Sequence, residues 1–245
     1  MTGAAVAGIG WVTAAGAGEG RQHTVFSMTD GALPAQLYES ARPGRSSRRG
    51  RQPEYARVGM TAVAYALRDA GLAEWTAKRP IGLSASTTLG CLSTDVEYHR
   101  TLLPEGGGMA SPYLFAYTLP NCFAGEAAIE FGLTGPTFVA EDGRGESLLG
   151  WRLGLESLAS GECPAIVAGH LDYPVGAALP GIEAVVPGAV FMVLDAGGTA
   201  PVSGYGTIEW AGGGLRHNGA AVTNIVALVQ ACLRARAVQG TERGA

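Results

Sequence analysis

Residues 137–169, TFVAEDGRGESLLGWRLGLESLASGECPAIVAG, decide the fold class of this sequence. Thr137–Ala140 and Ala165–Gly169 are short apolar runs, which are typical of strands buried on both faces. Between them, Ser147–Ser160 has the apolar spacing of a helix, and Gly161 follows where a C-terminal cap is expected. A strand, a helix and a strand in this order predict a βαβ unit.

The same signals recur on both sides of this unit. Further strands are predicted at 4–12, 81–86, 189–194 and 202–211. Further helices are predicted at 54–70, 94–103, 121–131 and about 220–237, with 21–40 read as helix and connection. Strands that alternate with helices and are apolar throughout predict an α/β layered fold, whose central sheet is covered by helices on both faces.

Composition narrows the class of protein. Hydrophobic residues make up 47% of the 245 residues and charged residues only 16%, so disordered, coiled-coil and nucleic-acid-binding proteins fit poorly. The net charge of −4 argues against a general affinity for polyphosphates or anionic lipid.

Cysteine spacing and the N-terminus bear on metal sites and localisation. The four cysteines lie far apart without metal-ligand spacing, so we expect no metal site and no disulfide framework. The apolar start lacks the basic region of a signal peptide, and no run reaches the roughly 18 apolar residues of a membrane span. These features favour a protein of the reducing cytoplasm.

Two glycines near the start, Gly8 and Gly10, are separated by one residue, as in a dinucleotide-binding loop. The full GxGxxG pattern is absent, and no acidic residue ends a second strand at the required distance. We therefore expect close backbone packing here rather than a cofactor site.

Asn121–Thr137, NCFAGEAAIEFGLTGPT, resembles the β-ketoacyl synthase family, whose pattern N..AG..AI..GL.GP precedes the catalytic nucleophile. Gly161 and the later AGHLD of 168–172 resemble that family's G…AGG.E, and the spacing holds without a gap. Weaker similarity extends the match to roughly residue 195. The resemblance implies one half of a thiolase-like fold with a central mixed sheet, and we expect residues 1–245 to form a single domain of this kind.

In this family the strand after Gly-Pro leads into a sharp turn that carries an acyl-accepting cysteine at a helix N-terminus. The ungapped count places Arg144 at that position. The surrounding turn consists of Glu141, Asp142, Gly143 and Gly145, without a cysteine. An arginine stays protonated and cannot accept an acyl group, so we expect no catalytic residue here. Arg144 either fills the pocket mouth or is simply solvated.

Family members also have a second, similar half that carries two histidines, or a histidine and an asparagine, for decarboxylation. This sequence does not contain that half, and His23, His99, His170 and His217 match none of its motifs. Condensing chemistry is therefore not expected from this chain alone, and no cofactor is implied.

The resemblance also indicates partner surfaces. Tyr117, Thr118, Leu119 and Asn121 fall on the segment that crosses the dimer interface toward the partner's acyl pocket, although ordinary packing is an equal interpretation. The family's strand equivalent to Pro136–Ala140 pairs with its mate across a two-fold axis.

A basic loop, residues 42–52, contains Arg45, Arg48, Arg49 and Arg51. These arginines either dock an acidic acyl carrier protein or belong to a solvated loop.

The leading hypothesis is a non-catalytic subunit similar to the chain-length factors of polyketide, aryl-polyene or fatty-acid-like biosynthesis. It would pair with a full-length β-ketoacyl synthase, or with itself, and shape an acyl tunnel. One alternative is an acyl transferase or hydrolase using Ser147, or a cysteine, with His170. Another is a scaffold that only binds carrier protein. Cys122 and Cys163 are more consistent with structural cysteines.

Overall fold

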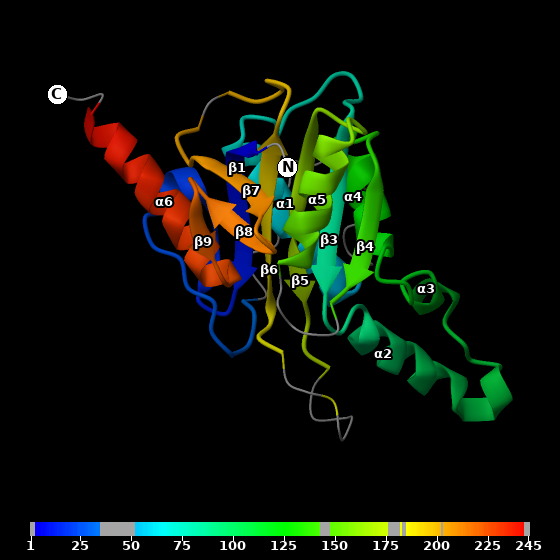
Figure 1. The fold of residues 1–245 in the computed structure, drawn as a ribbon. Helices are drawn as coiled ribbons and strands as arrows, with labels where there is room; N and C mark the ends of the chain where they lie inside the picture. The colour runs from blue at the N-terminus through cyan, green and yellow to red at the C-terminus, as the bar shows by residue number, and fades with distance from the viewer. Residues whose placement is uncertain are drawn as a thin grey trace.

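One mixed sheet runs through the whole molecule (Figure 1). The computed structural model describes residues 3–34, 52–142, 148–175, 182, 185–201 and 203–242. The strands are β1 (Ala4–Thr13), β2 (Gly16–Glu19), β3 (Ile81–Thr87), β4 (Thr137–Glu141), β5 (Ala165–Asp172), β6 (Gly188–Asp195), β7 (Thr207–Ala211), β8 (Gly214–His217) and β9 (Ala220–Val222). Their order across the nine-stranded sheet is β4-β3-β5-β6-β1-β7-β8-β9, and β2 pairs with β1.

The parallel part of the sheet confirms the βαβ prediction. β3 lies between β4 and β5 and is parallel to both, with Ser86 opposite Ala140 on one side and His170 on the other. β6 is antiparallel to β5 and to β1, so the sheet is mixed. Every residue of β5 and β6 is buried, which explains their continuous apolar sequences.

Helices cover both faces of the sheet. They are α1 (Glu54–Asp69), α2 (Leu92–Leu102), α3 (Pro112–Phe115), α4 (Cys122–Phe131), α5 (Leu149–Ala159) and α6 (Ile225–Glu242). α1 and α4 pack on the face that carries Val167 and Leu171, whereas α5 and α6 pack on the face that carries Ile166 and Ala168. Figure 1 shows α5 in front of the sheet and α1 behind it. The predicted two-sided layering is therefore confirmed.

α1 lies in direct backbone contact with β1. A Cβ atom added at Gly8 would lie 2.4 Å from the Ala70 nitrogen, and one at Gly10 would lie 2.2 Å from the Ala66 nitrogen. No side chain fits at either position, so the two glycines let the helix and the strand touch. This contact agrees with the expectation of close packing at this pair of glycines.

The C-terminal region differs from the prediction of a helix at about 220–237. Residues 214–217 and 220–222 are strands, and the helix begins only at Ile225. Two-residue turns connect these strands: Gly212 and Gly213 have φ angles of 63° and 81°, and Asn218 and Gly219 have 48° and 82°. Two consecutive positive φ angles are typical of the tight turns that join antiparallel strands. The strand predicted at 202–211 begins only at Thr207.

The N-terminal region also differs from its prediction. The expected loop before Gly20 forms β2, which pairs back on β1 through a turn between Thr13 and Gly16. The sequence predicts a helix within residues 21–40, but the described part contains only a 3-10 turn, Gly20–Gln22, and no regular element from residue 23 to 34. Residues 35–51 lie outside the described residues.

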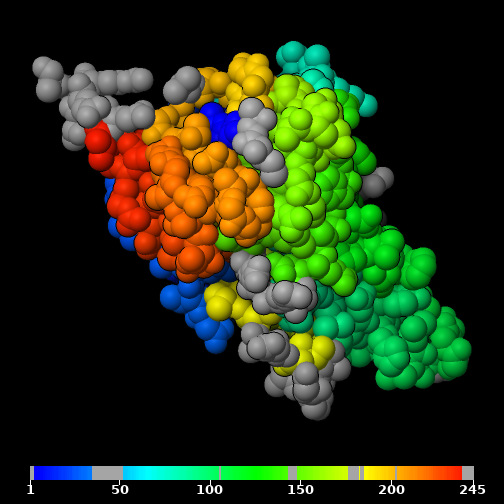
Figure 2. Space-filling view, in the orientation of Figure 1, coloured from blue at the N-terminus to red at the C-terminus, as the bar shows by residue number. Residues whose placement is uncertain are grey.

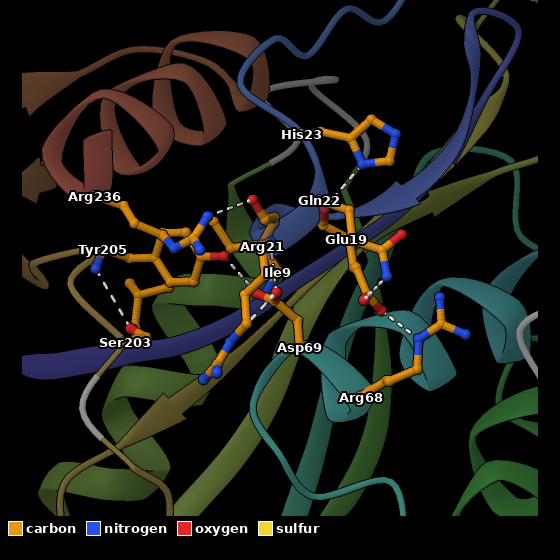
Figure 3. A network of polar contacts seen from close by, with 12 residues as sticks. Ile9, Glu19, Arg21, Gln22, His23, Arg68, Asp69, Ser203, Tyr205 and Arg236 are labelled. Carbon is orange, nitrogen blue, oxygen red and sulfur yellow. Dashed lines mark hydrogen bonds and ion pairs between the residues drawn. The ribbon is translucent and has the colours of Figure 1, made fainter. Parts of the chain in front are cut away.

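A buried carboxylate at the end of α1 ties together segments that are distant in sequence (Figure 3). Asp69 is fully buried and accepts hydrogen bonds from the Ile9 amide at 2.8 Å, the Arg21 amide at 2.6 Å and the Tyr205 hydroxyl at 2.7 Å. Burial raises the pKa of this carboxyl group, although the three donors act in the opposite direction. Around it, Arg236 donates to the Gly20 carbonyl at 3.1 Å.

Replacing Asp69 with alanine is expected to destabilise the protein by about 3 kcal/mol, because a buried donor left without its acceptor costs roughly 1–3 kcal/mol. Urea unfolding of the D69A variant would measure this loss. Tyr205→Phe removes one of the three donors and is expected to cost about 1 kcal/mol. A D69A variant that loses less than Tyr205→Phe would contradict the central role of this carboxylate.

Candidate functional site

Polar side chains gather at the carboxyl ends of the parallel strands β3 and β5, where sites of α/β proteins usually lie. Ser86 Oγ lies 3.0 Å from His170 Nδ1, and His170 Nε2 lies 2.9 Å from Asp172 Oδ2. The register of the two strands places Ser86 directly opposite His170. All three side chains are almost completely buried. They form one continuous hydrogen-bonded chain, which we call the Ser86–His170–Asp172 chain.

The second oxygen of Asp172 binds the segment that follows β3. Oδ1 accepts hydrogen bonds from Thr87 Oγ1 at 2.9 Å, the Thr88 amide at 2.8 Å and the Leu89 amide at 3.1 Å. Burial alone raises the pKa of Asp172, but the hydrogen bond and charge of His170, together with the Leu89 and Thr88 amides, lower it below its ordinary value. Asp172 is therefore ionised at neutral pH.

The ionised carboxylate fixes the proton of a neutral His170. Asp172 accepts a hydrogen bond from Nε2, so that nitrogen carries the proton. The lone pair of Nδ1 then faces the hydroxyl group of Ser86, which donates to it. Both ring nitrogens of His170 are thus engaged within the chain.

This arrangement bears on the hypothesis of a hydrolase or acyl transferase that uses His170. Ser147, its proposed partner, lies outside the described residues. The described cysteines are poorly suited as nucleophiles: burial raises the pKa of Cys122 and Cys163, and it raises the pKa of Cys91, where Asp95 adds to the effect, and of Cys232 to about 12. Cys122 Sγ contacts the Ala116 carbonyl at 2.9 Å rather than a histidine.

The turn predicted to replace the nucleophile site begins beside this chain. Glu141 ends β4 and is exposed, whereas Asp142 is buried and its amide donates to the Thr87 carbonyl at 2.7 Å. Gly143, Arg144 and Gly145 lie outside the described residues. The structure resumes at Leu148.

Beyond the turn, α5 lies directly on the ends of β3 and β5. A Cβ atom at Gly150 would lie 2.0 Å from the Gly169 carbonyl oxygen and 2.9 Å from the Ser86 amide nitrogen. Both flanks of the turn therefore contact the strands that carry the chain.

The predicted interface segment leads into α4. Tyr117 is buried and donates to Glu126 at 2.5 Å, while Thr118 is half-buried and donates to the Phe115 carbonyl at 2.8 Å. Leu119 is 61% exposed, and Asn121 is exposed at the N-cap of α4. The structure thus separates one buried anchor, Tyr117, from residues that are available to a partner.

Before this segment, residues 92–118 form a projecting arm. The arm contains α2, a 3-10 turn (Pro104–Gly107) and α3, and it extends away from the sheet (Figure 1). Figure 2 shows it as a lobe at the lower right of the molecule. Tyr98 and Phe115 contact each other within the arm, with ring centroids 5.6 Å apart.

Large apolar side chains are exposed on the arm and next to it. They are Leu103, Met109, Tyr113, Phe115, Leu119 and, on α4, Ile129, which is 78% exposed. β4, which follows α4, forms one edge of the sheet, and among the described strands it pairs only with β3. Exposed apolar side chains and an open strand edge are typical of a surface that another protein covers.

The arginines proposed for carrier-protein docking, Arg45, Arg48, Arg49 and Arg51, lie outside the described residues. Among the residues that are described, no cluster of three or more histidine, cysteine, aspartate or glutamate side chains could hold a metal ion. None of the described helices has the length and apolar character needed to span a bilayer.

A family model described as Beta-ketoacyl synthase, N-terminal domain matches residues 43–179. The chain belongs to the β-ketoacyl synthase family. The predictions of this family and of a thiolase-like α/β fold are therefore confirmed. The match includes the arm, α4, β4 and both flanks of the turn.

One relative of this β-ketoacyl synthase family member is a Streptomyces virginiae protein assigned as polyketide beta-ketoacyl synthase 1. The two are 29% identical over 157 residues, which cover 59% of this chain. The chain spans only 37% of the relative's length.

Solved structures share the fold at lower identity. The ishigamide ketosynthase/chain length factor has a TM-score of 0.60 at 16% identity, and the match covers 82% of this chain and 65% of that one. A ketosynthase in complex with its chain length factor from Xenorhabdus doucetiae has a TM-score of 0.52 at 11% identity, with 80% and 79% covered. A type II acyl-carrier protein in complex with its ketosynthase has a TM-score of 0.57 at 16% identity, with 79% and 62% covered.

The lowered pKa of Asp172 predicts a specific pH dependence. Its folded pKa lies below the ordinary value of about 3.9, so its stabilising effect is complete above that pH and is lost as the pH falls through the folded pKa. The difference in unfolding free energy between the wild type and Asp172→Asn should therefore stay constant from neutral pH to about pH 5 and shrink below about pH 4.

Asp69→Asn is the matched comparison, because burial raises the pKa of Asp69. The stabilising effect of the protonated Asp69 is present below the ordinary pKa and is lost as the pH rises through the folded pKa. Relative to Asp69→Asn, the wild type should therefore gain stability on acidification. Parallel pH profiles for the two variants would contradict these assignments.

Proposed function

We propose that this chain is a cytoplasmic, non-catalytic ketosynthase-like subunit. It pairs with an active β-ketoacyl synthase in polyketide, aryl-polyene or fatty-acid-like biosynthesis and forms part of the wall of an acyl tunnel. The open edge of β4, with exposed Leu119 and Ile129 nearby in the chain, is the observation that carries this proposal.

The open edge supports pairing. An edge strand presents unpaired backbone donors and acceptors, which soluble proteins usually cover or protect. The ends of β4, Thr137 and Glu141, are exposed, and Ile129 lies largely in water on the preceding helix. In the family, the equivalent strands of two subunits pair across a two-fold axis. Covering β4 in this way removes both the open edge and the exposed apolar side chains from water.

The chemistry of the turn supports a non-catalytic role. The sequence from Glu141 to Ser147 contains no cysteine, and Arg144 stands at the nucleophile position. A guanidinium group stays protonated and cannot form the acyl-enzyme intermediate. The raised pKa values of the described cysteines do not favour a substitute thiolate.

The exposed segment Thr118–Leu119 supports a role in setting chain length. In the family this segment reaches the partner's acyl pocket, so its side chains would form part of the tunnel wall. Growth of an acyl chain would stop when the tunnel is full, because a further unit would overpack it. The ketosynthase/chain length factor neighbours are consistent with this role.

Carrier-protein docking is the second partner interaction in the proposal. The sequence of 42–52 places four arginines, Arg45, Arg48, Arg49 and Arg51, where an acidic acyl carrier protein could be steered toward the complex. Such steering weakens as salt is added. The neighbour that contains an acyl-carrier protein with its ketosynthase is consistent with this assignment.

Co-expression with full-length β-ketoacyl synthases of the same organism tests the tunnel role. We expect a 1:1 complex by size-exclusion chromatography with light scattering. Leu119→Trp should shorten the product by at least one extension unit, because a larger side chain fills the end of the tunnel. The products are identified by mass spectrometry.

Val25→Trp is the matched control, since Val25 is 75% exposed and lies outside the arm and α4. It should leave product length unchanged. An unaltered product from a Leu119→Trp complex would exclude the tunnel role. Release of free acid from an acyl carrier by this chain alone would favour the hydrolase instead.

Ile129→Arg tests the pairing surface separately. A charge placed in a desolvated interface centre is expected to weaken the complex by about 30-fold or more, which corresponds to roughly 2 kcal/mol. The dissociation constant with the synthase measures this effect, and Val25→Arg is the control. If Ile129→Arg binds as tightly as the wild type, α4 does not belong to the interface.

A further inference from the structure

The Ser86–His170–Asp172 chain has the residue types and order of a serine hydrolase triad. Its distances of 3.0 and 2.9 Å are also within hydrogen-bond range. Burial argues against that chemistry. Ser86 is fully buried, and α5 packs so closely on it that a methyl group at Gly150 would collide with the Ser86 amide. A nucleophile must reach its substrate, so this hydrogen-bonded chain has a different role.

That role begins at Asp172, whose Oδ1 holds three consecutive residues, 87–89, through three hydrogen bonds. Thr87 Oγ1 in turn accepts a hydrogen bond from the Gly90 amide at 2.8 Å. Gly90 has a φ angle of 57° and packs against Pro120, where an added Cβ would lie 2.9 Å from the proline ring. Residues 87–90 therefore form a tight turn fixed by one buried carboxylate.

This turn leads directly into the projecting arm. α2 begins at Leu92, two residues after the turn. The arm is held together internally by the Tyr98–Phe115 ring contact and by the Ser111 amide, which donates to Thr101 Oγ1 at 3.0 Å. Because the arm is internally connected, the direction in which α2 leaves the turn sets the position of the whole arm.

We propose that Asp172, oriented by His170 and Ser86, is a positioning residue that fixes the arm and thereby places Phe115 and Leu119 for the partner subunit. This inference rests on the proposed function for the importance of that surface. The anchoring of residues 87–90 does not depend on it.

The hydrogen-bond pattern distinguishes two substitutions of Asp172. Asparagine retains an acceptor oxygen for the Thr88 and Leu89 amides, while its NH₂ group can donate to His170 Nε2 if the ring proton moves to Nδ1. Nδ1–H would then donate to Ser86 Oγ, whose proton can turn to the Gly169 carbonyl, 3.5 Å away. Alanine retains none of these contacts. Asp172→Asn should therefore preserve the arm, and Asp172→Ala should release it.

Amide hydrogen exchange followed by NMR tests the anchoring directly. In Asp172→Ala, exchange at Thr88, Leu89 and Gly90 and through α2 should accelerate about ten-fold or more, because these amides lose a buried acceptor. Asp172→Asn should stay within about three-fold of the wild type, and its His170 ¹⁵N shifts should report a proton on Nδ1 instead of Nε2. Ser84→Ala is the control, because the buried Ser84 hydroxyl binds the Gly150 carbonyl of α5 and not the chain.

The dissociation constant with the synthase completes the test. Asp172→Ala should weaken binding about ten-fold, whereas Asp172→Asn and Ser84→Ala should change it by less than about two-fold. Unchanged exchange at 88–90 in Asp172→Ala would overturn the anchoring. Faster exchange with unchanged binding would overturn the role toward the partner.

Two further outcomes distinguish a positioning role of Asp172 from a failed partner assignment and from a nucleophilic serine. If the wild type binds no synthase, the proposed function fails, while the exchange data still decide whether Asp172 anchors the arm. A fluorophosphonate probe is expected to leave Ser86 unmodified. A mass adduct on Ser86 that disappears in His170→Gln would show a nucleophile and overturn the positioning role.

Discussion

The direct contact between α1 and β1 is the constraint on which the rest of the structure depends. Gly8 and Gly10 bring the helix against the strand without intervening side chains, so α1 has one possible height above the sheet. At that height Asp69, the last residue of α1, reaches the Ile9 amide, and Tyr205 reaches the same carboxylate from the connection before β7. One backbone contact thus fixes the first strand, the first helix and the start of the C-terminal strands.

Local patterns predict the centre of the fold well and its margins poorly. The βαβ unit and the buried strands follow from apolar runs, because buried strands need little beyond continuous hydrophobicity. At the C-terminal end, the helical apolar spacing of 220–237 outweighs the turn signals before it, so the pattern predicts a helix where short strands form. Asn218-Gly219 and Gly212-Gly213 are dipeptides that favour tight hairpins, so those signals are present in the sequence.

The candidate site shows a different limit. The sequence singles out His170 from its place at the end of a predicted strand, but not its partner Ser86, which lies 84 residues away and is brought beside it only by the β3–β5 register. Long-range register is not encoded in local periodicity. Ser84 and Ser86, hydroxyl side chains within an otherwise apolar strand, are the available signal, because a buried hydroxyl group needs a partner.

The two edges of the sheet are unequal. β9 has three residues, whereas β4 has five and lies beside the arm. A second chain joined antiparallel along β4 would use the same edge of both molecules, leaving only the short β9 edges at the outer ends. Such an isologous contact is satisfied by two subunits and does not propagate. The unequal edges therefore favour an assembly that terminates as a dimer, rather than a filament of joined sheets.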